Sequence, residues 1–194
     1  MKNFIDLYIA ETIVVKGKLS EDKNAVQAIE DAVNLVVTAY KNGNKLLIAG
    51  NGGSAADAQH IAGELVAKFL IERPALNAVA LTTNTSIITS IGNDFSHEEI
   101  FARQIDAYAN KGDIYWAIST SGNSKNVIKS LEKAKEKGLV TIGLTGESQC
   151  LMDTFCDVII KVPSKKTPII QESHIMVGHL ICALVEKRLF NTWY

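Results

Sequence analysis

The feature that most constrains the fold is an alternation of short apolar runs with longer helical segments after residue 44. Five runs have the length of strands and are apolar throughout, which is typical of strands buried on both faces: 45–49, 77–81, 113–119, 140–144 and 157–162. Apolar residues at helical spacing predict helices over 54–72, 84–93, 97–109, 124–137 and 168–189. The alternation predicts an α/β fold with a five-stranded, parallel, doubly wound sheet of the flavodoxin-like type.

Residues 1–42 precede the first predicted strand and are predicted to form two helices. Ser20 is a partial N-cap signal for the second helix, and Asn42-Gly43-Asn44 ends it with residues that tolerate positive φ. We expect a single domain over 1–194, with 1–42 as a helical extension. These helices and the long last helix exceed the cover that the sheet needs, which favours an oligomer over a monomer, with Trp193 and Tyr194 packed at an interface.

Composition excludes several classes of protein. Lys and Arg number 20 against 21 Asp and Glu, so no basic excess indicates nucleic-acid binding. Three cysteines without a C-x-x-C motif suit a reducing compartment. No stretch approaches the roughly 18 continuous apolar residues of a membrane helix, and Asp6 and Glu11 interrupt the N-terminal apolar run as no signal peptide would. We expect a cytoplasmic protein that binds neither nucleic acid nor membrane.

A glycine-rich loop follows the first predicted strand. The sequence 50–54, Gly-Asn-Gly-Gly-Ser, leads into a helix at the carboxyl edge of the sheet, where open α/β folds bind ligands. Glycines let the backbone approach a ligand closely, and a helix N-terminus favours an anion. Position 55 is Ala and no acidic residue ends the second strand, so the dinucleotide fingerprint is incomplete. A plain tight turn is the alternative.

A hydroxyl-rich loop follows the third predicted strand, with the sequence Ser-Thr-Ser-Gly-Asn-Ser over 119–124. Four hydroxyls, a glycine and a helix start within six residues predict a phosphate cradle, in which hydroxyls and backbone N–H groups donate. This loop favours a phosphomonoester over a nucleoside triphosphate. The alternative is a helix-capping loop with surplus serines.

Four side chains on two helices have the chemistry of a catalytic site. His60 and Glu64 lie at i and i+4 and share one helix face, although such pairs are also common surface features. Gln171 and His179 are eight residues apart on the last helix, which corresponds to about 12 Å of rise and about 80° of rotation. Beside a phosphate cradle, these groups supply what enolisation of a sugar phosphate needs, and they also suit Zn²⁺.

Another helix ends at the same edge of the sheet with Gly92-Asn93-Asp94, where the side chains of Asn93 and Asp94 could hydrogen-bond a polyol. His97 follows Ser96, which is read as the N-cap of the next helix, and His97 is assigned no chemistry.

Together these motifs closely resemble those of the phosphoheptose isomerases, a family of SIS-domain (sugar isomerase) proteins. The resemblance rests on 49–65, 92–94, 118–124 and 171–179, and it extends over nearly the whole chain. It implies an aldose–ketose isomerase that converts sedoheptulose 7-phosphate to D-glycero-D-manno-heptose 7-phosphate through an enediol. In the family this is the first step toward the ADP- or GDP-heptoses of bacterial surface polysaccharide.

The resemblance also implies residue roles. Glu64 would be the base that moves a proton between C1 and C2, and His179 would be the partner acid. One Zn²⁺ per subunit would be held by His60, Glu64, Gln171 and His179. The implied substrate-binding residues are Asn51, Gly52, Gly53, Ser54, Glu64, Asn93, Asp94, Ser119, Thr120, Ser121, Ser124 and Gln171. The family forms homotetramers with helices at the centre and active sites at subunit interfaces.

The chain departs from the family pattern at two positions. Pro168 stands where many members carry an acidic residue, and Lys68 stands where many carry Arg, so a polyol contact could differ. Two alternatives to the heptose reaction follow. One is an isomerase of another sugar phosphate, such as a hexose or pentose phosphate. The other is a non-catalytic SIS regulator that binds the replication initiator protein, but that class lacks the glutamate found here as Glu64.

Overall fold

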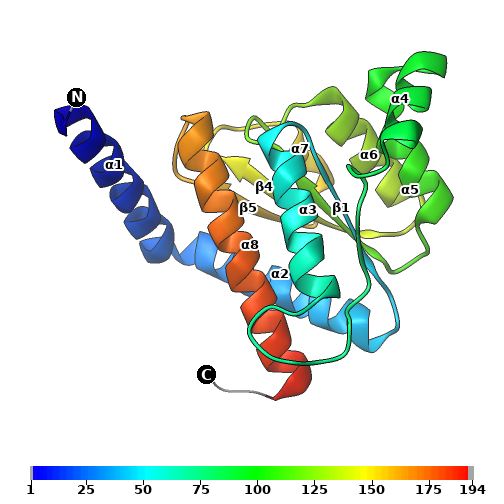
Figure 1. The fold of residues 1–194 in the computed structure, drawn as a ribbon, viewed down its shortest axis with the longest axis horizontal. Helices are drawn as coiled ribbons and strands as arrows, with labels where there is room; N and C mark the ends of the chain where they lie inside the picture. The colour runs from blue at the N-terminus through cyan, green and yellow to red at the C-terminus, as the bar shows by residue number, and fades with distance from the viewer. Residues whose placement is uncertain (1, 192–194) are drawn as a thin grey trace.

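The computed structural model describes residues 2–191 and contains a parallel five-stranded sheet with helices on both faces (Figure 1). The strands are β1 (Leu46–Gly50), β2 (Ala78–Ala80), β3 (Ile114–Ile118), β4 (Val140–Gly146) and β5 (Val158–Val162). Their spatial order is β2-β1-β3-β4-β5, with Ile48 of β1 in register with Ala80 of β2 and Trp116 of β3. This order confirms the predicted doubly wound, flavodoxin-like sheet.

The helices form two layers around the sheet. They are α1 (Lys2–Glu21), α2 (Lys23–Lys41), α3 (Gly53–Val66), α4 (Thr85–Asp94), the 3₁₀ turn η1 (His97–Glu99), α5 (Ala102–Tyr108), α6 (Lys125–Glu136), α7 (Met152–Phe155) and α8 (Thr167–Phe190). Helices α2, α3 and α8 cover one face, and α5, α6 and α7 cover the other (Figure 1).

Each face of the sheet has its own hydrophobic core. Ile48 and Trp116 pack against α2, α3 and α8, whereas Leu47 and Tyr115 pack against the opposite layer, and none of these four side chains is exposed. Burial on both faces explains why the strands are apolar at consecutive positions rather than at alternate ones. The strands therefore form a rigid platform whose carboxyl ends carry the two predicted ligand loops.

Two predicted helices have different limits in the structure. The helix predicted over 54–72 ends at Val66, because Glu186 of α8 accepts the backbone N–H groups of Phe69, Leu70 and Ile71 that would otherwise continue the helix. The helix predicted over 97–109 divides into η1 and α5, and the break falls at two buried residues, Ile100 and Phe101. Helix α7 was not predicted, since four residues carry too little periodicity.

The predicted helix caps were also partly wrong. Ser20 lies within α1, and Asp22 caps α2 by accepting the N–H groups of Asn24 and Ala25 at 2.9 and 3.3 Å. Ser96 precedes η1 in an extended conformation without a capping hydrogen bond from its side chain. Carboxylates and hydroxyls both serve as N-caps, and Ser20 and Asp22 are only two residues apart. The sequence alone therefore did not decide which of them caps α2.

Helix α8 is long and apolar enough to cross a membrane by length and composition, with a mean hydropathy of 1.3 in its most apolar window. Half of that window is buried, and Val177, Ile181 and Val185 belong to the core shared with α2 and α3. In this fold α8 therefore serves as a core helix of the sheet.

Helix α1 projects from the rest of the chain (Figure 1). It exposes large apolar side chains on most of its surface: Phe4, Ile5, Leu7, Ile9, Ile13 and Val14. Such a surface is typical of an interface between copies, but the oligomeric state stays a prediction. The predicted interface residues Trp193 and Tyr194 lie outside the described residues.

Candidate active site

Helices α3 and α8 lie side by side and run in the same direction, and this arrangement builds the site (Figure 1). Residues early in α3 contact residues early in α8, and later residues of α3 contact later residues of α8. A Cβ on Gly53 would lie 2.5 Å from Nε2 of Gln171, and a Cβ on Gly178 would lie 2.8 Å from Cδ1 of Ile61. Gly178 thus allows a close approach of the two helices one residue before His179.

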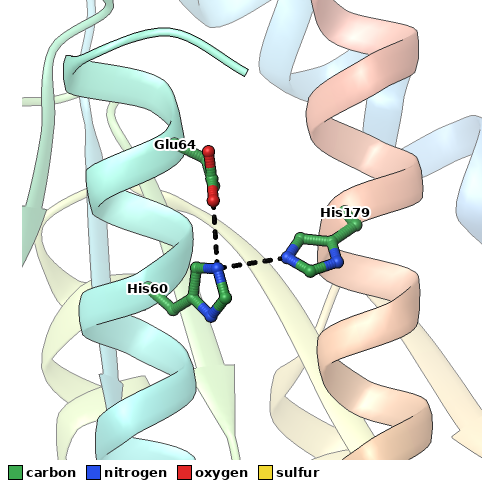
Figure 2. Close-up of side chains that lie close together, drawn as sticks. All are labelled: His60, Glu64 and His179. Atoms are coloured by element: carbon green, nitrogen blue, oxygen red, sulfur yellow. Dashed lines mark hydrogen bonds and ion pairs between the residues drawn. The ribbon is translucent and has the colours of Figure 1, made fainter. Parts of the chain in front are cut away.

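Three predicted side chains converge between these helices (Figure 2). Nε2 of His60 lies 3.0 Å from Oε1 of Glu64 and 3.2 Å from Nε2 of His179. The two imidazole rings meet edge to face, with centroids 4.8 Å apart. The prediction that His60 and Glu64 share one helix face is confirmed, and His179 joins them from α8.

The cluster fits a zinc ion by donor type and by spacing. Two imidazole nitrogens and a carboxylate oxygen are typical zinc ligands, and the three ligand atoms all lie within 4.8 Å of one another. Tetrahedral zinc with bonds of about 2.0–2.1 Å separates neighbouring ligand atoms by about 3.3 Å. The two separations from Nε2 of His60, 3.0 and 3.2 Å, are close to this value, and the remaining pair lies within 4.8 Å. The side chain of His60 is 48% exposed, so the cluster is open on one side.

Gln171, the fourth predicted ligand, lies about two turns nearer the start of α8. Its terminal amide packs against Gly53, and among residues 2–191 its side chain forms no hydrogen bond with the cluster. The structure therefore brings together three of the four predicted ligands, and Gln171 as a ligand stays a prediction. The rise of about 12 Å between Gln171 and His179 accounts for this separation.

The hydroxyls of the 119–124 loop converge on one another. Oγ of Ser119 lies 3.1 Å from Oγ of Ser124 and 3.5 Å from Oγ of Ser121, and it accepts the N–H of Gly122 at 3.2 Å. Ser124 precedes α6 but makes no capping hydrogen bond with its side chain. This arrangement disfavours the helix-capping alternative and suits an anion held by several hydroxyls.

A cavity of about 290 Å³ opens beside this loop. It is lined by Thr120 and Ser121 from the loop, by Ser164 and Lys165 from the segment between β5 and α8, and by Thr167 at the start of α8, among others. The lysine and hydroxyls give the cavity donors that suit a phosphate group.

The glycine-rich loop lies next to the hydroxyl loop. The side-chain amides of Asn51 and Asn126 donate to each other, each at 2.8 Å, and a Cβ on Gly50 would lie 2.8 Å from the carbonyl oxygen of Ile118. Gly52 has a φ of 56°, a conformation that glycine adopts without strain. The backbone of the loop therefore needs glycine at both positions 50 and 52. Gly50 allows a close contact with β3 that a plain tight turn would not need.

The remaining predicted substrate contacts differ in accessibility. Ser54 is only 3% exposed. Asn93 and Asp94 are exposed at the end of α4, where Nδ2 of Asn93 donates to Oδ1 of Asp94 at 2.7 Å. Asp94 lines another cavity, together with Arg103 and Tyr108. Within one copy of the chain, Asp94 and the hydroxyl-rich loop thus line different cavities.

Comparison with known proteins decides the family. A family model described as the SIS domain matches residues 8–146. Phosphoheptose isomerase 2 of Campylobacter jejuni is 54% identical over 98% of this chain and 95% of its own length, and the phosphoheptose isomerase of Aneurinibacillus thermoaerophilus is 53% identical over 98% and 96%. The chain belongs to the phosphoheptose isomerase family of SIS-domain proteins. This membership confirms the predicted isomerase class.

A solved structure of a phosphoheptose isomerase from Neisseria gonorrhoeae agrees with this membership. It superposes with a TM-score of 0.90 at 37% identity and covers 96% of this chain and 98% of its own. The phosphoheptose isomerase fold therefore extends over the N-terminal helices and α8 as well as the sheet.

Sequence reasoning missed three groups beside the cluster. Phe69 stacks on the imidazole of His179, and a buried ion pair joins Arg73 to Glu186. Asp57 lies on α3 one turn before His60; burial raises its pKa to about 6, while His60 opposes the rise, and one of its buried oxygens has no hydrogen-bond partner in the described chain. The Arg73–Glu186 pair spans 113 residues, so no local signal could have revealed it.

Proposed function

We propose that the chain interconverts sedoheptulose 7-phosphate and D-glycero-D-manno-heptose 7-phosphate, as the first step toward ADP- or GDP-heptose. The observation that carries the proposal is the convergence of Glu64, His60 and His179 in a chain of the phosphoheptose isomerase family. Aldose–ketose isomerisation needs two proton transfers, one between carbons and one between oxygens. A carboxylate and an imidazole at one site can perform both.

In the proposed mechanism, Glu64 takes a proton from C1 of the ketose, and the C1–H electron pair forms the double bond of an enediol. The same carboxyl group then returns the proton to C2. His179 moves the second proton, delivering it to O2 as the enediol forms and removing one from O1 as the aldose forms. No atom is gained or lost, because each proton leaves one position and arrives at the neighbouring one.

The loops would bind the parts of the substrate that do not react, which are its phosphate and the hydroxyl groups of its chain. Ser119, Thr120, Ser121 and Ser124 would bind the phosphate, assisted by the N-terminus of α6. This role is supported by the convergence of the three serine hydroxyls and by the place of Thr120 in the lining of the neighbouring cavity. The hydroxyl groups of the sugar chain would contact the loop that begins at Asn51 and the side chains of Asn93 and Asp94. These contacts would orient the chain so that C1 and C2 face Glu64.

A single Zn²⁺ per subunit would be held by His60, Glu64 and His179, with Gln171 as the fourth ligand. The donor set and the 3.0 and 3.2 Å separations support this proposal. When bound, the ion would polarise the carbonyl oxygen of the substrate and favour the enediol. His60, which is assigned no proton transfer, would then serve to fix the position of Glu64.

We further propose a cytoplasmic homotetramer. The exposed apolar surface of α1 supports an assembly, and an assembly would cover the open side of the cluster. Active sites at subunit interfaces would also bring together residues such as Asp94 and Ser121, which line different cavities within one copy.

A substrate panel tests the proposed reaction. The purified protein is offered sedoheptulose 7-phosphate, fructose 6-phosphate and ribulose 5-phosphate in a coupled assay, with and without added Zn²⁺. We expect turnover of sedoheptulose 7-phosphate, with a higher rate when Zn²⁺ is present. Preference for fructose 6-phosphate or ribulose 5-phosphate would contradict the substrate assignment, and binding without turnover of any sugar phosphate would indicate a regulator.

A further inference from the structure

The carboxylate of Glu186 organises the loop that follows α3. It is buried on α8 and accepts the backbone N–H groups of Phe69 and Leu70 at 2.9 Å and of Ile71 at 3.3 Å. Nε of Arg73 donates to it at 2.9 Å. Burial alone would raise the pKa of Glu186, but the N–H groups and the guanidinium together hold that pKa below its usual range. A charged acceptor therefore fixes four donors of one loop, three backbone N–H groups and one guanidinium nitrogen.

Arg73 ties the same loop to the last turn of α3. Its side chain is 1% exposed and donates to the carbonyl oxygens of Leu65 at 2.7 Å and Glu64 at 2.9 Å. These carbonyls end the helix and have no partner within it, and a cation at a helix C-terminus is also favourable for the helix dipole. The Arg73–Glu186 pair thereby connects the backbone of Glu64 on α3 to α8.

The pair acts close to the cluster. Glu186 and His179 are seven residues apart on α8, which places them on nearly the same helix face, two turns apart. Glu64 lies on the turn of α3 that Arg73 holds. The pair therefore fixes the position of α3 relative to α8 along the helix axes. The contact of Glu64 and His60 with His179 depends on this relative position.

Phe69, in the loop that the Arg73–Glu186 pair holds, contacts the imidazole of His179. The two rings are stacked, with centroids 5.3 Å apart and an angle of 24° between their planes. His60 meets the same imidazole edge to face. The ring of His179 thus has a neighbour on its face and another at its edge, and rotation about its Cβ–Cγ bond would break the stack.

We propose that Phe69 is a positioning residue for His179, and that the Arg73–Glu186 pair holds Phe69 in place. Phe69 keeps the plane of the imidazole turned so that Nε2 faces His60 and Glu64. This inference deepens the proposed function and rests on it, since it assigns His179 a task at the same site. This positioning role differs from ordinary hydrophobic packing because it requires a flat ring at position 69 and not only an apolar side chain of similar volume.

The test compares Phe69→Leu with Phe69→Tyr. Leucine keeps an apolar side chain but removes the flat ring, whereas tyrosine restores the ring. Leu70→Ala is the matched control, because Leu70 lies in the same loop and its side chain is 54% exposed. Each variant is measured for Zn²⁺ affinity by competition with a coloured chelator, for kcat and KM with sedoheptulose 7-phosphate, and for thermal unfolding.

We expect Phe69→Leu to weaken Zn²⁺ binding about tenfold and to lower kcat more than it raises KM, as does loss of a group that orients a metal-binding histidine. For Phe69→Tyr and Leu70→Ala, the Zn²⁺ affinity and kcat should stay within about twofold of the values of the unmodified protein. This change is smaller than the loss of about tenfold expected for Phe69→Leu. Unchanged zinc affinity and kcat in Phe69→Leu would overturn the proposal, as would failure of tyrosine to restore both.

The two readouts separate this inference from the proposed function. If the unmodified protein binds Zn²⁺ but does not isomerise the heptose phosphate, the proposed reaction fails, and zinc affinity alone decides the role of Phe69. If the protein isomerises the substrate without binding Zn²⁺, the metal proposal fails, and kcat decides. Absence of both activities would overturn the positioning role as well.

Discussion

At the scale of single residues, the site depends on hydroxyls and imidazoles whose surroundings differ sharply. The hydroxyls of Ser119 and Ser124 lie 3.1 Å apart, and Ser124 makes no capping hydrogen bond to α6, whereas His174 on α8 is fully buried in the fold. The sequence could identify the residue types but not which histidine was buried. The resemblance selected His60 and His179, and the contact between α3 and α8 brings these two together, whereas His174 lies against the backbone carbonyl of Thr145.

Replacement of Ser121 tests the phosphate cradle. If its hydroxyl binds the phosphate equally in the ground state and the transition state, Ser121→Ala should raise KM about tenfold with little change in kcat. Thr154→Ala on α7, which removes a hydroxyl bonded locally to Leu151, is the control. Steady-state kinetics with sedoheptulose 7-phosphate provide the measurement, and an unchanged KM in Ser121→Ala would count against the cradle.

His174 predicts a pH dependence of stability. Burial lowers its pKa to about 4, against a backbone hydrogen bond to Thr145 that partly opposes the shift. The native state keeps this imidazole neutral while the unfolded chain protonates it near pH 6.5, so stability is complete above pH 6.5 and declines as the pH falls toward 4, by up to about 3 kcal/mol.

Urea unfolding between pH 7 and pH 4 measures this decline. In the variant His174→Gln the part of the decline that belongs to this imidazole should disappear, whatever the absolute stability of the variant. Identical pH profiles for the variant and the unmodified protein would show that His174 is protonated in the folded state.

At the scale of secondary structure elements, the sequence predicted the sheet well because its strands are buried on both faces and are apolar throughout. The end of α3 was predicted poorly because long-range contacts set it, and the break between η1 and α5 was not predicted. The N–H groups of the loop after α3 bind Glu186, more than 110 residues away, and the break between η1 and α5 falls at Ile100 and Phe101, which are buried in the core. Helical periodicity carries no record of such contacts.

The same limit applies to the candidate site. The i, i+4 spacing of His60 and Glu64 was sufficient to place them together, and the loop sequences were sufficient to indicate a phosphate site. The meeting with His179 depends on the parallel packing of α3 and α8, which the sequence alone did not reveal. Phe69 had no signal at all, since its role exists only across that packing.

The close approach of these two helices at Gly178 leads to a prediction. A Cβ at this position would lie 2.8 Å from Cδ1 of Ile61, so Gly178→Ala should force the helices apart and lower the free energy of unfolding by about 1–3 kcal/mol. Chemical denaturation measures the loss. The double variant with Ile61→Val, which removes that methyl group, should recover part of the stability, and a fully stable single variant would contradict the close-packing account.

At the scale of the whole molecule, α1 is the element that the single chain leaves least explained. It projects from the body and exposes large apolar side chains that a monomer would leave in water (Figure 1). A homotetramer would bury this surface and would complete the sites by bringing loops of different copies together.

Charged substitutions on α1 test this assembly. We expect the unmodified protein to sediment as a tetramer, and the double variant Leu7→Asp, Ile13→Asp to dissociate, since both side chains are more than 60% exposed in the single chain and their burial would leave carboxylates in an apolar interface. Analytical ultracentrifugation reports the mass. A monomeric unmodified protein would remove the basis for sites shared between copies.

The central claim is that Glu64 transfers the proton between C1 and C2, and Glu64→Gln tests it most directly. Glutamine keeps the size of the side chain but cannot accept the proton, so kcat for sedoheptulose 7-phosphate should fall by about two to four orders of magnitude, with the fold and the sedimentation coefficient unchanged. Deuterium exchange from solvent into the substrate should be lost to the same extent. A variant that folds normally and retains full turnover would contradict the assignment of Glu64 as the base.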